Sequence, residues 1–365
     1  MFRMNIEFAN LQLQYQMYKA EIDNNIFRVL NNSNYIMGQE INEFEGALEK
    51  FTGVKHAIAC SSGTDALLLS MMAMDIKPGD EIITTPFTFI STAETIASLK
   101  AKPVFVDIDP ETFNIDPNLV VAAITNKTRA IMPVSLYGQP ADMDDIQLIA
   151  DKHKLKVIVD GAQSFGAKYG HQTDSALGDV STTSFFPAKP FGCYGDGGAV
   201  FTNSDIYAEK IRMMRVHGQN KQYHHKYLGL GGRLDTIQAA VLLAKLPHFS
   251  NELVARQQVA DRYTDGLIDV VDTPVIKSKR TSTWAQYTVK VSNRDHVQSK
   301  LRDSGIPTSV YYPIPLHLQE CFEYLKYNKG DFPHAEQASR VVMSLPMNPF
   351  LKNDEIDYVI EKLAE

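Results

Sequence analysis

The stretch Ser184-Phe-Phe-Pro-Ala-Lys-Pro-Phe-Gly-Cys-Tyr-Gly-Asp-Gly-Gly198 is the central stretch of this chain. It places Lys189 on a proline-flanked turn between an apolar, strand-like run and a glycine-rich bend. The glycines of the bend permit backbone angles that other residues avoid, and they let the chain approach a ligand closely. The stretch therefore predicts a lysine that is held in place to react, rather than a solvated lysine on the surface.

Two polar sites upstream also follow apolar strand-like runs. Asp160 ends a run of valines and isoleucine, and a carboxylate there needs a partner because burying it alone is costly. Gly63 and Thr64 open a helix after the run 56–60, so their backbone N–H groups and the threonine hydroxyl can bind a phosphate. Ordinary helix caps are the alternative at both places. Together with Lys189, these residues predict a pyridoxal phosphate site, in which Asp160 pairs with the pyridinium nitrogen.

Three further residues are candidates for the same site. Ser184 ends the strand before Lys189 and can hold the phosphate beside the amine. Gln163 can hydrogen-bond the ring hydroxyl of the cofactor. Phe89, which we expect to begin a helix after the strand 81–85, can stack on the ring, although core packing is the more common role of such an aromatic residue. We expect Lys189 to act as the general base once burial has lowered the pKa of its amine.

The composition is that of an ordinary globular protein with a large core. The chain has 365 residues, of which 44% are apolar and 22% are charged, and its formal net charge is −7. This charge and the lack of a basic block argue against nucleic-acid binding. Cys60, Cys193 and Cys321 have no metal-type spacing, so we expect reduced thiols and no metal site. The sequence shows no signal-like N-terminus and no apolar run of ~20 residues, so we expect a cytoplasmic protein without a membrane segment.

Strand-like and helical patterns alternate along the first two thirds of the chain. The expected helices include 12–31, 39–51, 91–100 and 143–153, and the expected strands are 56–60, 81–85, 104–106, 130–134, 157–159, 182–186 and 199–202. The alternation implies right-handed crossovers and a mainly parallel, seven-stranded sheet that is buried on both faces. In such sheets ligands bind beyond the carboxyl ends of the strands, where each of the candidate residues above falls.

After residue 240 the alternation ends. The expected elements there are a long helix at 236–268, a strand at 284–291, a helix at 297–304, an extended segment at 309–312, and helices at 334–342 and 353–363. The whole pattern predicts an α/β fold with two tightly packed parts. These are a large cofactor-binding domain at residues 1–245, with the N-terminal helices, and a smaller α+β domain at residues 246–365.

With Asp160, Gln163, Ser184 and Lys189 in this order, the chain resembles the sugar-nucleotide aminotransferases of the DegT/DnrJ/EryC1/StrS family, and the likeness covers nearly all of it. The supporting stretches are Ser62-Gly-Thr-Asp-Ala-Leu, Val106-Asp-Ile-Asp, Leu136-Tyr-Gly, Asp160-Gly-Ala-Gln-Ser-Phe-Gly-Ala and Arg233-Leu-Asp-Thr-Ile-Gln-Ala-Ala. The resemblance implies a fold-type-I pyridoxal 5′-phosphate enzyme. It also implies the cofactor-binding roles given above, which belong to Gly63, Thr64, Phe89, Asp160, Gln163, Ser184 and Lys189.

The resemblance further implies a homodimer whose two active sites each take residues from the other subunit. The segment that ends at Arg233 is expected to cross over. Members of the family often carry an asparagine two positions before this arginine, where this chain has Gly231. Either backbone N–H groups or water replace that contact, or phosphate binding is weaker. A histidine is also more usual where this chain has Tyr311.

Within the family, the stretches around Lys189, Gln222-Tyr-His-His and Val342-Met-Ser-Leu-Pro-Met resemble one subgroup. Its members aminate UDP-2-acetamido-2-deoxy-3-oxo-D-glucuronate at carbon 3 for surface polysaccharide (O-antigen) synthesis. L-glutamate is the amino donor, 2-oxoglutarate leaves, and the cofactor passes through pyridoxamine 5′-phosphate, so we expect ping-pong kinetics.

Arg233 is the expected partner of the sugar's 6-carboxylate, because a guanidinium can grip a carboxylate with two parallel hydrogen bonds. A structural arginine at a helix start is an equal alternative. Tyr312 and His317 are expected to line the sugar pocket.

Other functions stay open on the sequence alone. A dTDP-3-keto-6-deoxyhexose 3-aminotransferase would have no carboxylate to bind, and amination at carbon 4 is a further option. A non-enzymatic regulator that senses a sugar with the same fold would need a nucleic-acid-binding element. The sequence shows neither a basic patch nor a helix-turn-helix pattern. A related dehydratase would carry histidine at position 189.

Overall fold

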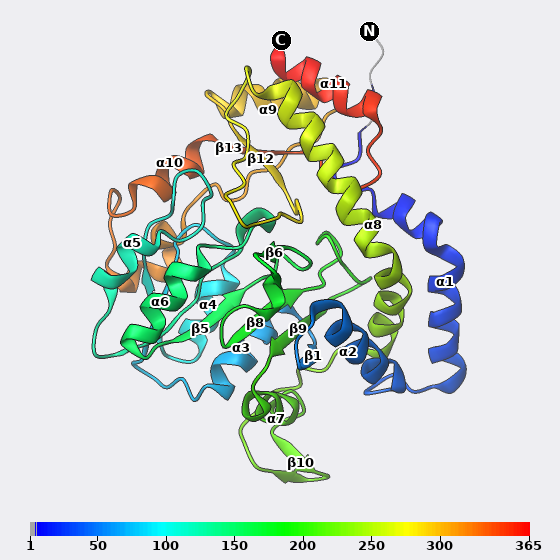
Figure 1. Cartoon of the computed structure of the whole chain (residues 1–365), viewed down its shortest axis with the longest axis vertical. Coiled ribbons are helices and arrows are strands. Elements are labelled where there is room, and N and C mark those ends of the chain that lie inside the picture. The colour runs from blue at the N-terminus through cyan, green and yellow to red at the C-terminus, as the bar shows by residue number, and fades with distance from the viewer. Residues whose placement is uncertain (1–3, 5) are drawn as a thin grey trace.

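The computed structural model describes residue 4 and residues 6–365 (Figure 1). The N-terminal stretch in which the sequence shows no signal-like pattern lies partly outside these residues. Seven strands form the central sheet, in the order β1-β9-β8-β5-β4-β2-β3. They are β1 (His56–Cys60), β2 (Glu81–Thr84), β3 (Lys102–Phe105), β4 (Thr128–Ile131), β5 (Lys156–Asp160), β8 (Val180–Ser184) and β9 (Gly198–Thr202).

The direction of the strands confirms the predicted sheet. β3, β2, β4, β5 and β8 are parallel, whereas β9 is antiparallel to both of its neighbours, β8 and β1. The sheet is therefore seven-stranded and mainly parallel, and the predicted strands differ from the observed ones only by a few residues at their ends.

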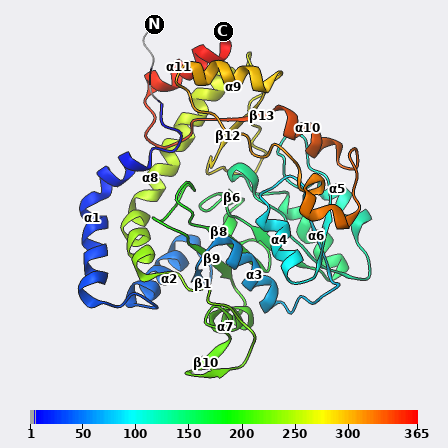
Figure 2. The same ribbon diagram turned by 180° about the vertical axis from the view of Figure 1, so that it is seen from behind.

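Helices cover both faces of this sheet (Figures 1 and 2). Alternate residues of a strand point to opposite faces. In β5, Val157 and Val159 belong to the apolar cluster that includes α6 (Met143–His153). Ile158 belongs to the cluster that includes α3 (Gly63–Ala73) and α4 (Ser91–Ser98). The sheet is buried on both sides, as predicted. The helices of this part are α1 (Leu11–Asn32), α2 (Gln39–Thr52), α3 (Gly63–Ala73), α4 (Ser91–Ser98), α5 (Pro117–Val120), α6 (Met143–His153) and α7 (Asp205–Met214).

The long helix α8 (Thr236–Leu267) links the sheet to the C-terminal part of the chain (Figure 2). Its first half packs on α1 and α2, and its second half packs on α11 (Asn353–Ala364). The predicted boundary between residues 245 and 246 falls inside this helix, so the division into two domains stays a prediction. Within the part of the chain described, no helix combines the length and the apolar character that crossing a bilayer requires.

The C-terminal part contains a strand that the sequence analysis did not predict. β12 (Tyr287–Lys290) pairs antiparallel with β13 (Val342–Leu345), which directly follows α10 (Pro333–Val341). A four-residue apolar run is too short for its periodicity to separate strand from helix. The remaining elements are α9 (Arg294–Asp303), β6 (Lys168–Tyr169), β7 (Gln172–Thr173), β10 (Gln219–Lys221), β11 (His224–His225), and the 3₁₀ helices η1 (Val121–Ala123), η2 (Leu136–Gly138), η3 (Asp174–Ala176), η4 (Leu316–Leu318) and η5 (Glu320–Leu325).

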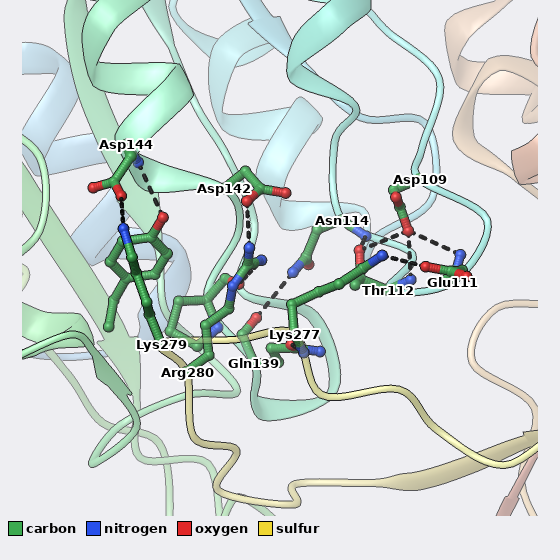
Figure 3. Close-up of polar contacts among 12 residues, drawn as sticks. Asp109, Glu111, Thr112, Asn114, Gln139, Asp142, Asp144, Lys277, Lys279 and Arg280 are labelled. Atoms are coloured by element: carbon green, nitrogen blue, oxygen red, sulfur yellow. Dashed lines mark hydrogen bonds and ion pairs between the residues drawn. The ribbon is translucent and has the colours of Figure 1, made fainter.

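The segment 275–280 crosses back over the large part and is held there by polar contacts (Figure 3). The side-chain amide of the buried Gln139 forms two hydrogen bonds with the backbone of this segment. Nε2 donates to Val275 O at 2.9 Å, and Oε1 accepts from Lys277 N at 2.8 Å. Ion pairs flank these bonds and join Lys277 to Glu111, Lys279 to Asp144 and Arg280 to Asp142. The segment ties the region after α8 to the loops beside the sheet.

We expect Gln139→Ala to lower the free energy of unfolding by about 2 kcal/mol, because it removes both of these bonds from a buried site. The measurement is urea denaturation followed by the fluorescence of Trp284, the single tryptophan of the sequence. Lys279→Ala is the matched control, since it breaks an exposed ion pair of the same segment and should change the free energy of unfolding far less. Equal losses for the two variants would contradict the role given to Gln139.

Candidate active site

The candidate residues meet at one edge of the central sheet. β2, β5 and β8 run in the same direction, and β1 shares it because the strand between β1 and β8 is antiparallel to both. Their carboxyl ends therefore lie at the same edge. The segments that follow these strands, 61–64, 85–92, 160–163 and 184–189, carry all but three of the residues singled out from the sequence.

Asp160 and Lys189 lie close enough for their charges to interact. Asp160 is buried at the end of β5, where Oδ2 accepts from Thr92 Oγ1 at 2.7 Å and Oδ1 accepts from Ala162 N at 3.2 Å. Burial raises the pKa of Asp160, whereas the two hydrogen bonds and the charge of Lys189 lower it. Burial lowers the pKa of Lys189 to about 8, and Asp160 opposes this shift. A fraction of the Lys189 amine is thus unprotonated near neutral pH, the form that can attack an aldehyde.

The turn that carries Lys189 is fixed by its own backbone. Lys189 N donates to Phe186 O at 2.9 Å, and Cys193 N donates to Phe185 O at 2.8 Å, which closes the turn at its base. The two limbs lie so close that a Cβ on Gly192 would stand 2.6 Å from Phe186 O. Only glycine fits there, so the composition of this stretch follows from the shape of the turn.

Gly63 and Ser184 lie against each other although they are far apart in the sequence. A Cβ on Gly63 would stand 2.8 Å from Ser184 Cβ. Gly63 and Thr64 open α3, and the first N–H groups of a helix have no partner within it. Thr64 Oγ1 is 2.8 Å from Ser91 Oγ, which stands at the start of α4. Hydroxyl groups and helix N–H groups thus gather at one place, and these are the donors that bind a phosphate.

Gln163 is fixed by two hydrogen bonds. Its Oε1 accepts from Tyr137 N at 2.7 Å, and its Nε2 donates to Tyr312 Oη at 3.1 Å. The Tyr312 ring, which comes from the C-terminal part, has its centroid 6.3 Å from that of Phe89. Phe89 precedes α4, which starts at Ser91, and does not begin the helix as the sequence predicted. Its side chain is 54% exposed, so much of the ring is available to a ligand.

The two other substrate candidates have different surroundings. His317 is buried in η4, with Nε2 3.2 Å from Glu336 Oε1 and its ring centroid 4.7 Å from that of Phe332. Burial lowers the pKa of His317, so the ring is held mainly neutral. Arg233 is half-buried in the short connection between Gly231, which bridges to Val216, and the start of α8. The substrate-binding roles of His317 and Arg233 stay predictions.

Thr92 and Asp174 support this site, and the sequence analysis named neither. Asp174 is buried, and its two oxygens accept from Ser135 Oγ at 2.7 Å and from Ser164 Oγ. A Cβ on Gly161 would stand 2.5 Å from Asp174 Oδ2, so this carboxyl packs directly against the turn after Asp160. Burial raises the pKa of Asp174 to about 6.

The donor set fits pyridoxal phosphate. Gly63, Thr64 and Ser184 offer groups for the phosphate, and a fraction of the Lys189 amine is unprotonated near neutral pH and can react with the aldehyde. Asp160 is a buried carboxylate with acceptor capacity left for the ring nitrogen, which matches the partner that a buried anion requires.

Asp174→Asn should change how stability depends on pH. In the wild type the folded state keeps a proton on Asp174 up to about pH 6, whereas the unfolded chain releases it near pH 3.8. Stability from this group is therefore full below pH 3.8 and is lost as the pH rises through about 6. The loss is on the order of 3 kcal/mol.

The asparagine variant lacks this loss. The difference between its free energy of unfolding and that of the wild type should therefore shift in favour of the variant from pH 4 to about 6 and stay constant above pH 6. Urea denaturation across this range measures the difference. A difference that does not vary with pH would reject the raised pKa.

Comparison with known proteins places the chain among aminotransferases. The model of the DegT/DnrJ/EryC1/StrS aminotransferase family matches residues 16–364. The chain is 50% identical over 360 residues to the UDP-2-acetamido-2-deoxy-3-oxo-D-glucuronate aminotransferase of Pseudomonas aeruginosa, covering 98% of this chain and 99% of that one. It is 46% identical over 366 residues to the pleiotropic regulatory protein of Geobacillus stearothermophilus, covering 99% and 98%.

Among solved structures, NtdA from Bacillus subtilis with bound cofactor PMP matches with a TM-score of 0.92 and 32% identity, over 98% of this chain and 84% of that one. These findings confirm the fold, the enzyme class and the cofactor that the sequence predicted. The chain belongs to the DegT/DnrJ/EryC1/StrS aminotransferase family, whose members are pyridoxal phosphate-dependent enzymes.

Proposed function

We propose that this aminotransferase converts UDP-2-acetamido-2-deoxy-3-oxo-D-glucuronate to UDP-2-acetamido-3-amino-2,3-dideoxy-D-glucuronate, with L-glutamate as the amino donor. The observation that carries this proposal is the 50% identity with the Pseudomonas enzyme of that name over 98% of the chain. The site supports it, because Asp160 and Lys189 are brought together at one edge of the sheet. A cytoplasmic location and a place in O-antigen synthesis remain parts of the same proposal.

Lys189 would be the residue that attaches the cofactor and transfers protons. Bound pyridoxal phosphate supplies an electron sink at the carbon that loses or gains the amino group. The amine of Lys189 would hold the cofactor, remove the proton from the α-carbon of glutamate and return a proton to carbon 3 of the sugar. Asp160 would keep the ring nitrogen protonated, and the Thr92 hydroxyl would keep Asp160 oriented.

The remaining site residues would bind and position. Gly63, Thr64 and Ser184 would hold the phosphate, which fixes one end of the cofactor. Phe89 would stack on the ring. Gln163 would bind the ring hydroxyl through the second hydrogen of its Nε2. The orientation of the amide is fixed by the hydrogen bonds with Tyr137 N and Tyr312 Oη.

The second subunit would complete the site. The hairpin of β10 and β11 projects from the body of the chain (Figure 1). Tyr223 in the turn of this hairpin and Leu228 just after it are 83% and 89% exposed, and large exposed apolar side chains are typical of an interface. Arg233 follows this hairpin. We propose that it crosses into the partner's site, as the resemblance implies, and grips the 6-carboxylate of the sugar there.

A sugar-sensing regulator is the second candidate function, because the Geobacillus relative is named a pleiotropic regulatory protein and is 46% identical. A sensor has no need of an amine whose pKa is lowered to about 8 beside a buried carboxylate, so the site favours the enzyme.

The decisive experiment supplies purified holoenzyme with UDP-2-acetamido-2-deoxy-3-oxo-D-glucuronate, made in situ by the matching dehydrogenase, and L-glutamate. The amino sugar is then identified by mass spectrometry and NMR. A 3-amino uronic acid supports the proposal. Turnover of a dTDP-3-keto-6-deoxyhexose without turnover of the uronate would transfer the assignment to that substrate class, and turnover of neither would favour the sensor.

Reconstitution should report the pKa of Lys189 directly. We expect the rate at which pyridoxal phosphate joins the apoprotein to rise with pH and to have its midpoint near pH 8, because only the unprotonated amine attacks. The measurement is the growth of visible absorption after mixing. A midpoint at the ordinary lysine value of 10.5 would contradict the effect of burial, and covalent attachment in Lys189→Ala would reject the residue.

Arg233→Ala should raise the KM for the uronate roughly 10- to 100-fold, since a charge-assisted hydrogen-bonded pair is lost. A 6-deoxy sugar, if it is turned over, should be unaffected. Mixing Arg233→Ala with Lys189→Ala under conditions of subunit exchange tests the crossing. Hybrid dimers would contain one intact site only if Arg233 serves the partner, so recovered turnover is expected. No recovery in dimers shown to be mixed would mean that Arg233 acts in its own subunit or only in packing.

A further inference from the structure

Lys245 is a buried lysine of α8 that the proposed function does not use. Its side chain is 3% exposed, its Nζ donates to the carbonyl oxygen of Gly192, and Nζ lies 5.5 Å from the centroid of the Tyr194 ring. Burial lowers its pKa to about 8, while Glu252 and Cys193 favour the charged form. Burying an ammonium group costs free energy that a methionine of similar length would not cost. The position therefore depends on what the ammonium group holds.

Gly192, which Lys245 holds, belongs to the turn that carries Lys189. A Cβ on Gly192 would stand 2.6 Å from the carbonyl oxygens of both Phe186 and Pro187, so the two limbs of the turn are in contact. Phe186 O in turn accepts the hydrogen bond of Lys189 N at 2.9 Å. A shift of the Gly192 carbonyl is thus passed through two contacts to the backbone of Lys189.

A second side chain of α8 holds the same limb. Gln238 lies seven residues, about two helical turns, before Lys245 and so on the same face of the helix. Its Oε1 accepts from Tyr194 N at 2.8 Å, and its Nε2 donates to Tyr194 O at 3.3 Å. α8 therefore fixes the returning limb of the turn at 192 and at 194.

The row of buried polar groups continues along α8 toward the C-terminal part. Glu252 accepts from Gln14 Nε2 at 2.9 Å, and Arg256 Nη1 donates to Trp284 O at 3.0 Å and to Met347 O at 3.4 Å. Arg256 resembles Lys245 in being a buried cation of the same helix that donates to backbone carbonyls, but its carbonyls lie outside the turn. It provides a matched control.

We propose that Lys245 is a positioning residue for Lys189: by holding the Gly192 carbonyl it sets where the Lys189 amine stands relative to Asp160. This inference rests on the role proposed for Lys189. A merely structural lysine would affect the stability of the fold and leave the titration of the bound cofactor unchanged.

The test compares the holoenzymes of wild type, Lys245→Met, Lys245→Arg and Arg256→Met after loading with pyridoxal phosphate. The first readout is the pH midpoint of the visible absorption of the attached cofactor. The second is the single-turnover rate with L-glutamate, and the third is the Tm. Lys245→Met removes the donor, and Lys245→Arg keeps one.

We expect Lys245→Met to move the pH midpoint by about 0.5 unit or more, because the lysine shifts relative to its carboxylate. The single turnover should slow roughly 10- to 100-fold through the misplaced amine. Lys245→Arg should largely restore the wild-type pH midpoint and single-turnover rate. Arg256→Met should lower the Tm while the midpoint stays at the wild-type value. If Lys245→Met does not fold, Lys245→Gln, whose shorter arm cannot reach as far, replaces it with the same readouts.

A fall in Tm of the Lys245 variant without a change in midpoint would overturn the inference, and so would an equal midpoint shift in Arg256→Met. The underlying role of Lys189 is tested apart from this: attached cofactor that persists in Lys189→Ala would reject that role and the inference together.

Discussion

The structure depends on one electrostatic arrangement, a buried carboxylate at the end of one strand facing a lysine that follows the neighbouring strand. β5 and β8 are adjacent and parallel, with Asp160 opposite Thr182. This register brings residue 160 and the end of β8 to the same edge, and the turn after Ser184 then carries Lys189 back toward the carboxylate. Because side chains alternate between the faces of a strand, a slip of one residue in β5 would turn Asp160 away and leave a buried charge without a partner.

Asp160 and its neighbour Asp174 are both buried carboxyls whose pKa is raised by burial, but their surroundings differ. Asp160 receives a threonine hydroxyl, a backbone N–H and the field of Lys189. Asp174 receives two serine hydroxyls and the repulsion of Asp160, and its pKa is raised to about 6. Two buried carboxyls so close together do not ionise with equal ease. One carboxyl thus stands at the position that we propose for the ring nitrogen, and the other packs against the turn after it.

The sequence was informative where chemistry follows directly from a strand end. Asp160 ends a strand, and Gly63 and Lys189 follow strands within five residues; the alternation of strands and helices brings such ends to one edge. Thr92 and Lys245 could not be found this way. Thr92 stands 68 residues from Asp160, and Lys245 stands 53 residues from Gly192. A threonine near a helix start and a lysine inside a helix are common in any sequence, so only the folded chain shows what they contact.

The same reasoning explains the misplaced elements. The predicted helix 334–342 includes Val342, but this residue begins the strand Val342–Leu345, which pairs with β12. Tertiary pairing decides such short apolar runs. Phe89, expected to begin a helix, instead precedes it, which leaves the ring exposed at the sheet edge rather than packed into a helix face.

The segments that carry Phe89 and Tyr312 are far apart in the sequence, and a backbone hydrogen bond joins them. Leu316 N donates to Pro86 O at 2.7 Å. Pro86 lies three residues before Phe89, and Leu316 lies four residues after Tyr312. His317, next in the chain, is buried against Glu336 and anchors the segment to α10. This bond lies within four residues of each aromatic residue along the chain, so it restrains the distance between the segments of Phe89 and Tyr312. The contact of the buried histidine with Glu336 thus ties the segment that follows Tyr312 to α10.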